Sequence, residues 1–145
     1  MKRITRSAIV EHRAEEMYAL VDDIESYPRF LPWCQAARVE RHADGSAAAT
    51  LTIGMRGLRT SFTTHNENRV GEAIDLRLVQ GPFRSFAAAW RFKPLSEEAC
   101  RIEFSLEYEL SGPLARVLAP LFDRIADTMV DAFMRRAAEV YGAQG

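Results

Sequence analysis

Apolar and polar residues alternate with a period of two through the middle of the chain, from about residue 36 to residue 110. This pattern is typical of strands in an antiparallel sheet with one dry face and one wet face. Turn-forming residues interrupt the alternation at the spacing of a meander. The apolar positions of the clearest strands are Ala47, Ala49, Leu51, Ile53 and Met55; Ile74, Leu76 and Leu78; Phe86, Ala88, Trp90 and Phe92; and Ile102, Phe104, Leu106, Tyr108 and Leu110.

The period becomes helical toward both ends of the chain. Residues 14–22 predict a short helix, preceded by a first strand at residues 3–10. A longer apolar stripe with steps of three and four lies between Gly112-Pro113 and Gly142, and it would span roughly 40 Å as a helix. Pro120 leaves open whether this helix is kinked or begins there. The stripe comprises Leu114, Val117, Leu118, Leu121, Phe122, Ile125, Met129, Val130, Phe133, Ala137 and Val140.

A long striped helix and a sheet with one dry face can bury each other if the sheet curls around the helix. We therefore predict an α+β fold with a curved antiparallel sheet wrapped around a long C-terminal helix. The length of 145 residues suits one domain over residues 1–145, and 48% hydrophobic residues with 27% charged ones is an ordinary globular balance.

Charge and cysteine content exclude several classes of protein. Nineteen basic and twenty acidic residues give a net charge of −1, so no global field draws the chain to nucleic acid. No apolar run reaches the roughly 18 residues of a membrane span, and the basic N-terminus leads into no signal sequence. Two cysteines cannot form a disulfide framework. We expect a cytoplasmic protein.

The predicted dry face carries residues of unequal size, because Ala47, Ala49 and Ala88 share it with large aromatic residues such as Trp90 and Phe104. Small residues facing large ones occur in interdigitated cores. They also occur at the floor of an apolar pocket, and a curved sheet around a helix leaves room for one. Both interpretations are open.

Four large apolar residues lie in a connection broken by two prolines, where polar residues are expected. They are Tyr27, Phe30, Leu31 and Trp33. They could plug one end of the core, or form a lid or a membrane-touching mouth for an apolar ligand, and these roles do not exclude each other.

No arrangement of residues predicts catalysis or metal binding. His12, His42 and His65 lie far apart, and none has a ligand-like spacing to a cysteine or an acid. His65 could line a pocket, although a surface position is more common for a lone histidine. Cys34 and Cys100 are typical of small core residues. We expect no catalytic residue, metal or catalytic cofactor.

One stretch of the predicted sheet is basic. Between Arg56 and Lys93 there are seven basic and three acidic residues, a difference of +4. If these side chains share the wet face, they could meet phosphate groups of RNA or of lipids. A plain solvated face is the alternative.

Several ordered strings resemble the coenzyme Q-binding START-like family, whose bacterial members include ribosome-association toxins. The resemblance covers nearly the whole chain. The strings are MYALVDD (17–23), YPRFLPWC (27–34), FTTHN (62–66), LVQGPF (78–83), WRFKPL (90–95), AC (99–100), MVDAF (129–133) and RAAEVYG (136–142).

The resemblance implies a helix-grip (START-like, SRPBCC) fold with a hydrophobic tunnel between the sheet and the C-terminal helix, where a polyprenyl quinone would bind. The sequence departs from the family at Ala88-Ala89, where members often carry glycine, and these methyl groups would narrow the tunnel. By position, the mouth would involve Tyr27, Phe30, Leu31 and Trp33, and the wall Phe83, Phe86, Trp90, Met129 and Phe133.

Three functions follow from the resemblance. The first is a non-catalytic module that binds ubiquinone in support of respiration, with transient contact to the inner face of the membrane. The second is a toxin that binds the large ribosomal subunit, blocks subunit joining and has an antitoxin partner. The third and weakest is a polyketide cyclase-like enzyme, which needs polar catalytic groups in a cavity whose predicted lining is nearly all apolar.

Overall fold

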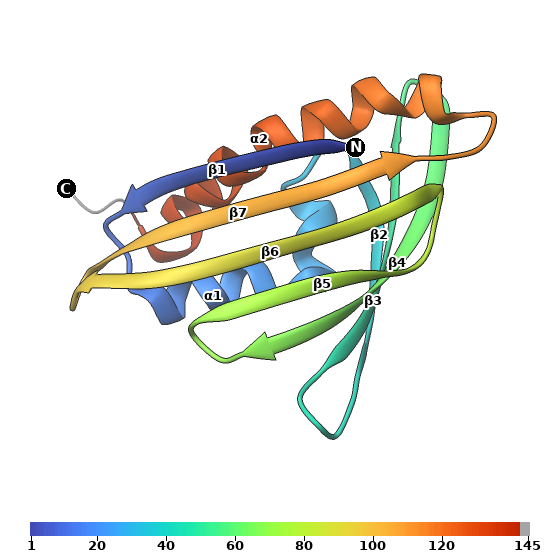
Figure 1. Cartoon of the computed structure of the whole chain (residues 1–145). Coiled ribbons are helices and arrows are strands. Elements are labelled where there is room, and N and C mark those ends of the chain that lie inside the picture. Colours follow the sequence, from blue (N-terminus) through green and yellow to red (C-terminus); the bar gives the residue numbers. More distant parts are fainter. Residues whose placement is uncertain (143–145) are drawn as a thin grey trace.

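A single antiparallel sheet dominates the computed structural model, which describes residues 1–142. Its seven strands lie in the order β1-β7-β6-β5-β4-β3-β2. Strands β2 to β7 therefore form a meander, and β1 pairs with β7 at the opposite edge (Figure 1). The strands are β1 (Lys2–Val10), β2 (Cys34–Arg41), β3 (Ala47–Met55), β4 (Leu58–Arg69), β5 (Ala73–Gln80), β6 (Phe83–Ser96) and β7 (Ala99–Leu110).

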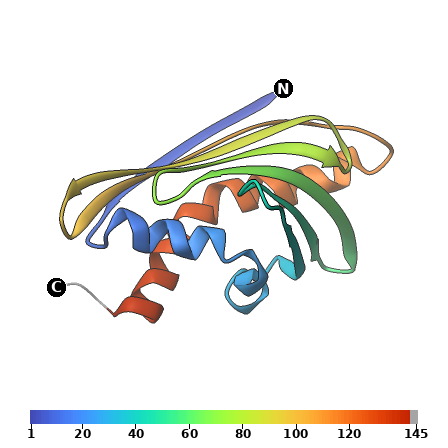
Figure 2. The ribbon, with the colours of Figure 1, turned by 90° about the horizontal axis from the view of Figure 1, so that it is seen from below.

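The helices lie on one side of the sheet, which arches over them (Figure 2). They are α1 (Ala14–Asp22), the 3₁₀ helix η1 (Ile24–Arg29) and the long α2 (Ala115–Tyr141). The predicted α+β fold, a curved antiparallel sheet wrapped around a long C-terminal helix, is confirmed.

The alternating pattern of the sequence corresponds to the two faces of the sheet. On β7, Ile102, Phe104 and Leu106 are buried, whereas Arg101 is exposed and Glu103 and Ser105 are half-buried. The apolar stripe of α2 faces the same layer, so one hydrophobic core fills the space between sheet and helix.

Helix α2 differs from its prediction at both ends. It begins at Ala115 and continues through Pro120, in its second turn, so the helix does not begin at that proline. Leu114, Val117 and Val140, which the stripe places on the buried face, are exposed.

The proline-broken connection closes one end of the core. Its first part is η1, which contains Pro28. Tyr27, Leu31 and Trp33 are buried, and Phe30 is half-buried. The plugging role is therefore what this structure displays, with Phe30 as the member of the four that reaches solvent.

Candidate functional site

An apolar cavity lies between the sheet and the three helices. Its volume is about 70 Å³. Strands β3, β4 and β5 supply much of its lining, because their inward residues include short side chains that leave space below α2. The cavity is lined by Val21, Ile24, Tyr27, Ala49, Leu51, Phe62, Thr64, Asn66, Ile74, Leu76, Trp90, Phe104 and Met129.

Two polar side chains interrupt this apolar lining. Thr64 and Asn66 are 3% and 1% exposed, and they follow Phe62 on the inward face of β4. The Thr64 hydroxyl donates a hydrogen bond of 2.6 Å to Asn66 Oδ1. The two residues thus form a single polar spot on the cavity wall.

Three of the nine predicted ligand-binding residues line the cavity: Tyr27, Trp90 and Met129. The Tyr27 hydroxyl donates a hydrogen bond of 2.5 Å to the carbonyl oxygen of Val21, which turns it toward the backbone. Burial raises the pKa of the Tyr27 phenol, so this hydroxyl keeps its proton.

Phe30 and Phe133 pack directly behind these residues. Their ring centroids lie 5.2 Å apart, and Phe133 lies 5.5 Å from Tyr27 and 5.4 Å from Trp90. The guanidinium carbon of Arg136 lies 5.0 Å from the centre of the Phe30 ring. The half-buried Phe30 thus separates the aromatic cluster from a cation at the surface.

The other predicted residues lie outside the lining. Phe83 and Phe86 pack against each other at 5.1 Å, and both contact Phe62, which lines the cavity. Leu31 and Trp33 are buried in the connection that follows η1. The structure therefore places the nine residues in and around two neighbouring aromatic clusters.

The small residues of the dry face have different surroundings. Ala49 lines the cavity, whereas Ala47 and Ala88 are buried outside it. Both interpretations of the sequence apply in part, because most of the layer is packed core and a small pocket remains beside Ala49.

Titratable groups with a pKa near neutrality are missing from the lining. It contains no carboxylate, histidine, lysine or arginine. Both cysteines are buried, as expected of core residues, and burial raises the pKa of the Cys34 and Cys100 thiols to about 11 in each case. At neutral pH these thiols are therefore protonated and unreactive.

The histidines are equally remote from the cavity. His65 follows Thr64 on β4, faces the opposite side of the sheet and stacks on His42 with centroids 6.4 Å apart. Among residues 1–142, no group of three or more His, Cys, Asp or Glu side chains could hold a metal ion. Within the same residues, no helix has the length and apolarity to cross a membrane.

The basic stretch from Arg56 to Lys93 is largely neutralised in the fold. Cross-strand ion pairs join Arg77 to Glu67 at 3.0 Å and Arg91 to Asp75 at 2.8 Å. Two further basic residues pair with acids of β7, Arg84 with Glu109 and Lys93 with Glu103.

Arg56 and Arg59 differ from these residues. They lie at the turn between β3 and β4, are exposed, and form no ion pair within 4.0 Å in the described part of the chain. The charge available to a partner is therefore smaller and more local than the +4 count suggested.

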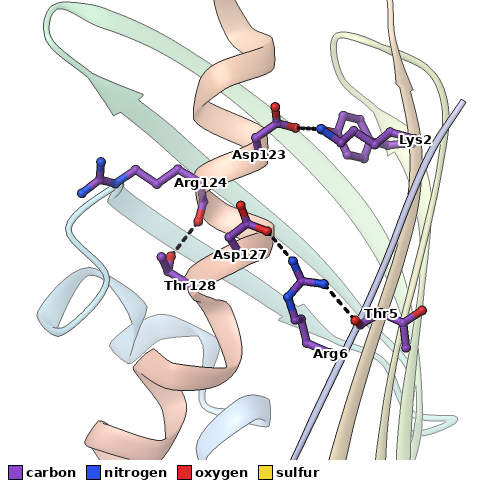
Figure 3. A network of polar contacts seen from close by, with 8 residues as sticks. Lys2, Thr5, Arg6, Asp123, Arg124, Asp127 and Thr128 are labelled. Atoms are coloured by element: carbon purple, nitrogen blue, oxygen red, sulfur yellow. Dashed lines mark hydrogen bonds and ion pairs between the residues drawn. The ribbon is translucent and has the colours of Figure 1, made fainter.

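A polar clasp ties β1 to α2 at the edge of the sheet (Figure 3). Lys2 Nζ lies 2.6 Å from Asp123 Oδ1, and Arg6 lies 2.6 Å from Asp127 Oδ1. The Tyr108 hydroxyl donates a third bond of 2.8 Å to Asp123. The Lys2 ammonium is the main cause of a lowered pKa of the Asp123 carboxyl. This clasp holds the helix against the β1 side of the sheet.

The family model described as "Polyketide cyclase / dehydrase and lipid transport" matches residues 10–134. The chain belongs to this family. It is also similar, with 41% identity over 145 residues, to the ribosome association toxin RatA of Escherichia coli, and the match covers 99% of this chain and 92% of the relative.

A second relative carries a different description. The coenzyme Q-binding protein COQ10 homolog B, mitochondrial, of Xenopus laevis is 31% identical over 157 residues, covering 99% of this chain and 62% of the relative. The expected resemblance to the coenzyme Q-binding START-like family and its bacterial toxin members is confirmed.

Solved structures confirm the helix-grip fold. The Zhui aromatase/cyclase from Streptomyces sp. R1128 superposes with a TM-score of 0.82 over 99% of both chains, at 13% sequence identity. That likeness concerns the fold alone. Together, the relatives are consistent with a hydrophobic-ligand binding protein or a ribosome-associated one.

The polar spot of Thr64 and Asn66 was not among the predicted site residues. The string FTTHN drew attention to His65, which faces away from the cavity. The period of two contained the missing signal, because it places Thr64 and Asn66 on the same face as Phe62.

Proposed function

We propose that this protein binds a hydrophobic small molecule without transforming it, and that the ligand is a polyprenyl quinone such as ubiquinone, carried in support of respiration. The observation that carries the proposal is the apolar cavity between the sheet and α2, lined almost wholly by apolar side chains. The similarity to a coenzyme Q-binding relative supports the choice of a quinone.

The ligand site in this proposal combines the cavity wall with the aromatic residues next to it. Tyr27, Trp90 and Met129 would contact the ligand in the existing cavity. The remaining members would contact it as the space extends toward either cluster; they are Phe30, Leu31, Trp33, Phe83, Phe86 and Phe133.

A quinone ring requires more room than the closed cavity offers. The cavity of about 70 Å³ is less than half of the roughly 150 Å³ in which an engineered apolar cavity holds benzene. Binding must therefore displace side chains. Phe30 and Met129 are suited to this because both are half-buried and methionine is flexible.

The clasp between β1 and α2 favours an entrance on the opposite side, near η1. Lys2 and Arg6 hold α2 to the β1 edge, so that side resists opening. A polyprenyl tail partitions into a bilayer. The proposal therefore includes a cytoplasmic protein that touches the inner face of the membrane briefly to exchange its ligand.

The absence of acid–base groups from the cavity lining supports a binding role rather than a cyclase role. Cyclase chemistry would need a positioned group to move protons. The two polar lining residues besides Tyr27 are Thr64 and Asn66, and neither ionises near neutral pH.

A fluorescence titration tests the binding site. Trp33→Phe leaves Trp90 as the reporter, and a ubiquinone with two isoprene units is the probe. We expect saturable quenching, and Ala49→Leu in this background should weaken binding by at least about tenfold because leucine fills the cavity. Ala19→Leu makes the same substitution at an exposed position of α1 and should have no effect. Equal affinities in all three proteins would show that the quinone does not occupy this cavity.

A second candidate function is association with the large ribosomal subunit, which would block subunit joining and involve an antitoxin partner. The specific observation in its favour is the 41% identity over 99% of the chain to a ribosome association toxin. Cosedimentation with purified large subunits at low and high salt tests it. Reversing Arg56 and Arg59 to glutamate should lower the bound fraction more than reversing the paired Arg77 and Arg91. No sedimentation of the wild-type protein at low salt would contradict it.

A further inference from the structure

We infer that the side-chain amide of Asn66 is a hydrogen-bond donor for the ligand, and that the ligand carries a neutral carbonyl oxygen at the end inserted into the cavity. This inference rests on the proposed function and adds to it the chemistry by which the site would select among apolar ligands.

The first argument is the burial of an incompletely satisfied amide. Asn66 is 1% exposed and lines the cavity. Its Oδ1 accepts the Thr64 hydroxyl at 2.6 Å, but its Nδ2 donates no hydrogen bond within residues 1–142. A buried amide without a partner costs free energy, and native proteins rarely leave one unsatisfied. An acceptor that enters the cavity would remove this cost.

The second argument concerns orientation. Since Oδ1 is engaged by Thr64, the amide presents its N–H groups rather than its oxygen to the space beside it. The backbone around the pair is fixed, because residue 66 pairs with Ala47 on β3 and with Leu76 on β5. The donor is therefore held in place before any ligand arrives, which lowers the entropic cost of using it.

The third argument excludes a charged ligand. No lysine, arginine or histidine lines the cavity, so a carboxylate or phosphate would lie there without a counter-charge. A neutral carbonyl requires only one or two donors and leaves the rest of the ligand apolar. The side chains beside the amide, Ala49, Leu76 and Trp90, suit such a ligand because the first is short and the other two are apolar.

The carbonyl could belong to a quinone ring or to a linear isoprenoid ketone, and three probes separate these sources. They are a ubiquinone with two isoprene units, a linear isoprenoid ketone of similar length, and an isoprenoid hydrocarbon of that length without oxygen. Their affinities are measured for the wild-type protein, Asn66→Leu and Thr64→Val. The Thr64→Val variant is the matched control because it removes the neighbouring hydroxyl and keeps the amide.

We expect Asn66→Leu to weaken binding of at least one carbonyl probe by about tenfold while hydrocarbon binding is unchanged or stronger. Thr64→Val should alter carbonyl binding by less than about threefold. A loss confined to the quinone identifies a ring carbonyl as the acceptor, and a loss for both probes identifies any neutral carbonyl.

Two results would overturn the inference in distinguishable ways. If all three probes bind the wild-type protein and Asn66→Leu affects none selectively, the protein binds apolar ligands but the amide is held by water. If no probe binds the wild-type protein, the proposed function fails together with the inference.

An NMR measurement on the wild-type protein needs no substitution. The Asn66 side-chain NH₂ protons should shift downfield when a carbonyl probe binds and should not do so with the hydrocarbon. Equal shifts with both probes would also overturn the inference.

Discussion

The layer between the sheet and α2 is packed differently at its two ends. At one end Phe83, Phe86 and Phe122 interlock, with Phe83 centred 5.1 Å from Phe86 and 4.8 Å from Phe122. The turn there is so close that a Cβ on Gly81 would lie 2.6 Å from the Cβ of Phe62. At the other end the short side chain of Ala49 leaves a cavity. The aromatic end suits a structural role, and the cavity end suits a ligand.

Phe62 connects the two ends. It lines the cavity and also contacts Phe83 and Phe122 at 5.7 and 6.0 Å. Because a close-packed aromatic cluster resists deformation, expansion of the cavity should proceed away from Phe62, toward Met129 and η1. The comparison therefore assigns stability to one end and adaptability to the other.

The largest effect is expected from Phe122→Ala at the aromatic end. Phe122 is buried and contacts Phe62, Phe83 and Tyr108. Its truncation should lower the free energy of unfolding by about 3–5 kcal/mol, as measured by urea denaturation. A loss below about 1 kcal/mol would mean that this end can collapse around the missing ring.

Ala47→Val and Ala49→Val compare neighbouring inward positions of β3. Ala47 is buried outside the cavity, so the added methyl groups should cost about 1–3 kcal/mol through overpacking. Ala49 borders free space, so the same change should be neutral or stabilising by about 0.5–1 kcal/mol. Equal costs in urea denaturation would contradict the difference in packing.

Met129→Ala tests whether the cavity end adapts. Because Met129 is half-buried beside existing space, its truncation should cost only about 1–2 kcal/mol. The enlarged cavity should bind the two-isoprene quinone at least as tightly as the wild-type cavity does. Weaker binding, measured by the same fluorescence titration, would indicate that the methionine itself contacts the ligand.

The smallest effect is expected at the clasp. Lys2 and Asp123 side chains are 51% and 40% exposed, so Asp123→Asn should cost less than about 1 kcal/mol at neutral pH. Because folding lowers the pKa of Asp123, its contribution is present above the unfolded pKa of about 3.9 and is lost as the pH falls through the folded value. The variant should therefore show a shallower loss of thermal stability in acid. Asp131→Asn, an exposed position on the same helix, is the control and should leave the acid limb unchanged.

The sequence predicted the architecture because periodicity reports directly on which face of an element is buried. It could not predict that Phe83 and Phe86, three residues apart, pack against the same ring of Phe62. A register shift between Phe83 and Ser85 makes this possible, and a strict period of two does not reveal it.

The charge count was limited by the same kind of non-local information. Glu103 and Glu109 lie outside the stretch from Arg56 to Lys93, yet they pair with Lys93 and Arg84 across neighbouring strands. For the cavity, the sequence identified small residues on the dry face, but only the packing around them distinguishes Ala49 from Ala47.

The central claim is that an apolar ligand occupies the space between the sheet and α2. Intermolecular nuclear Overhauser effects between the two-isoprene ubiquinone and the methyl groups of the wild-type protein test it most directly. We predict contacts to Ala49, Ile74 and Met129, which line the cavity. Contacts confined to exposed methyl groups such as those of Val79 and Val117 would place the quinone on the surface and contradict the claim.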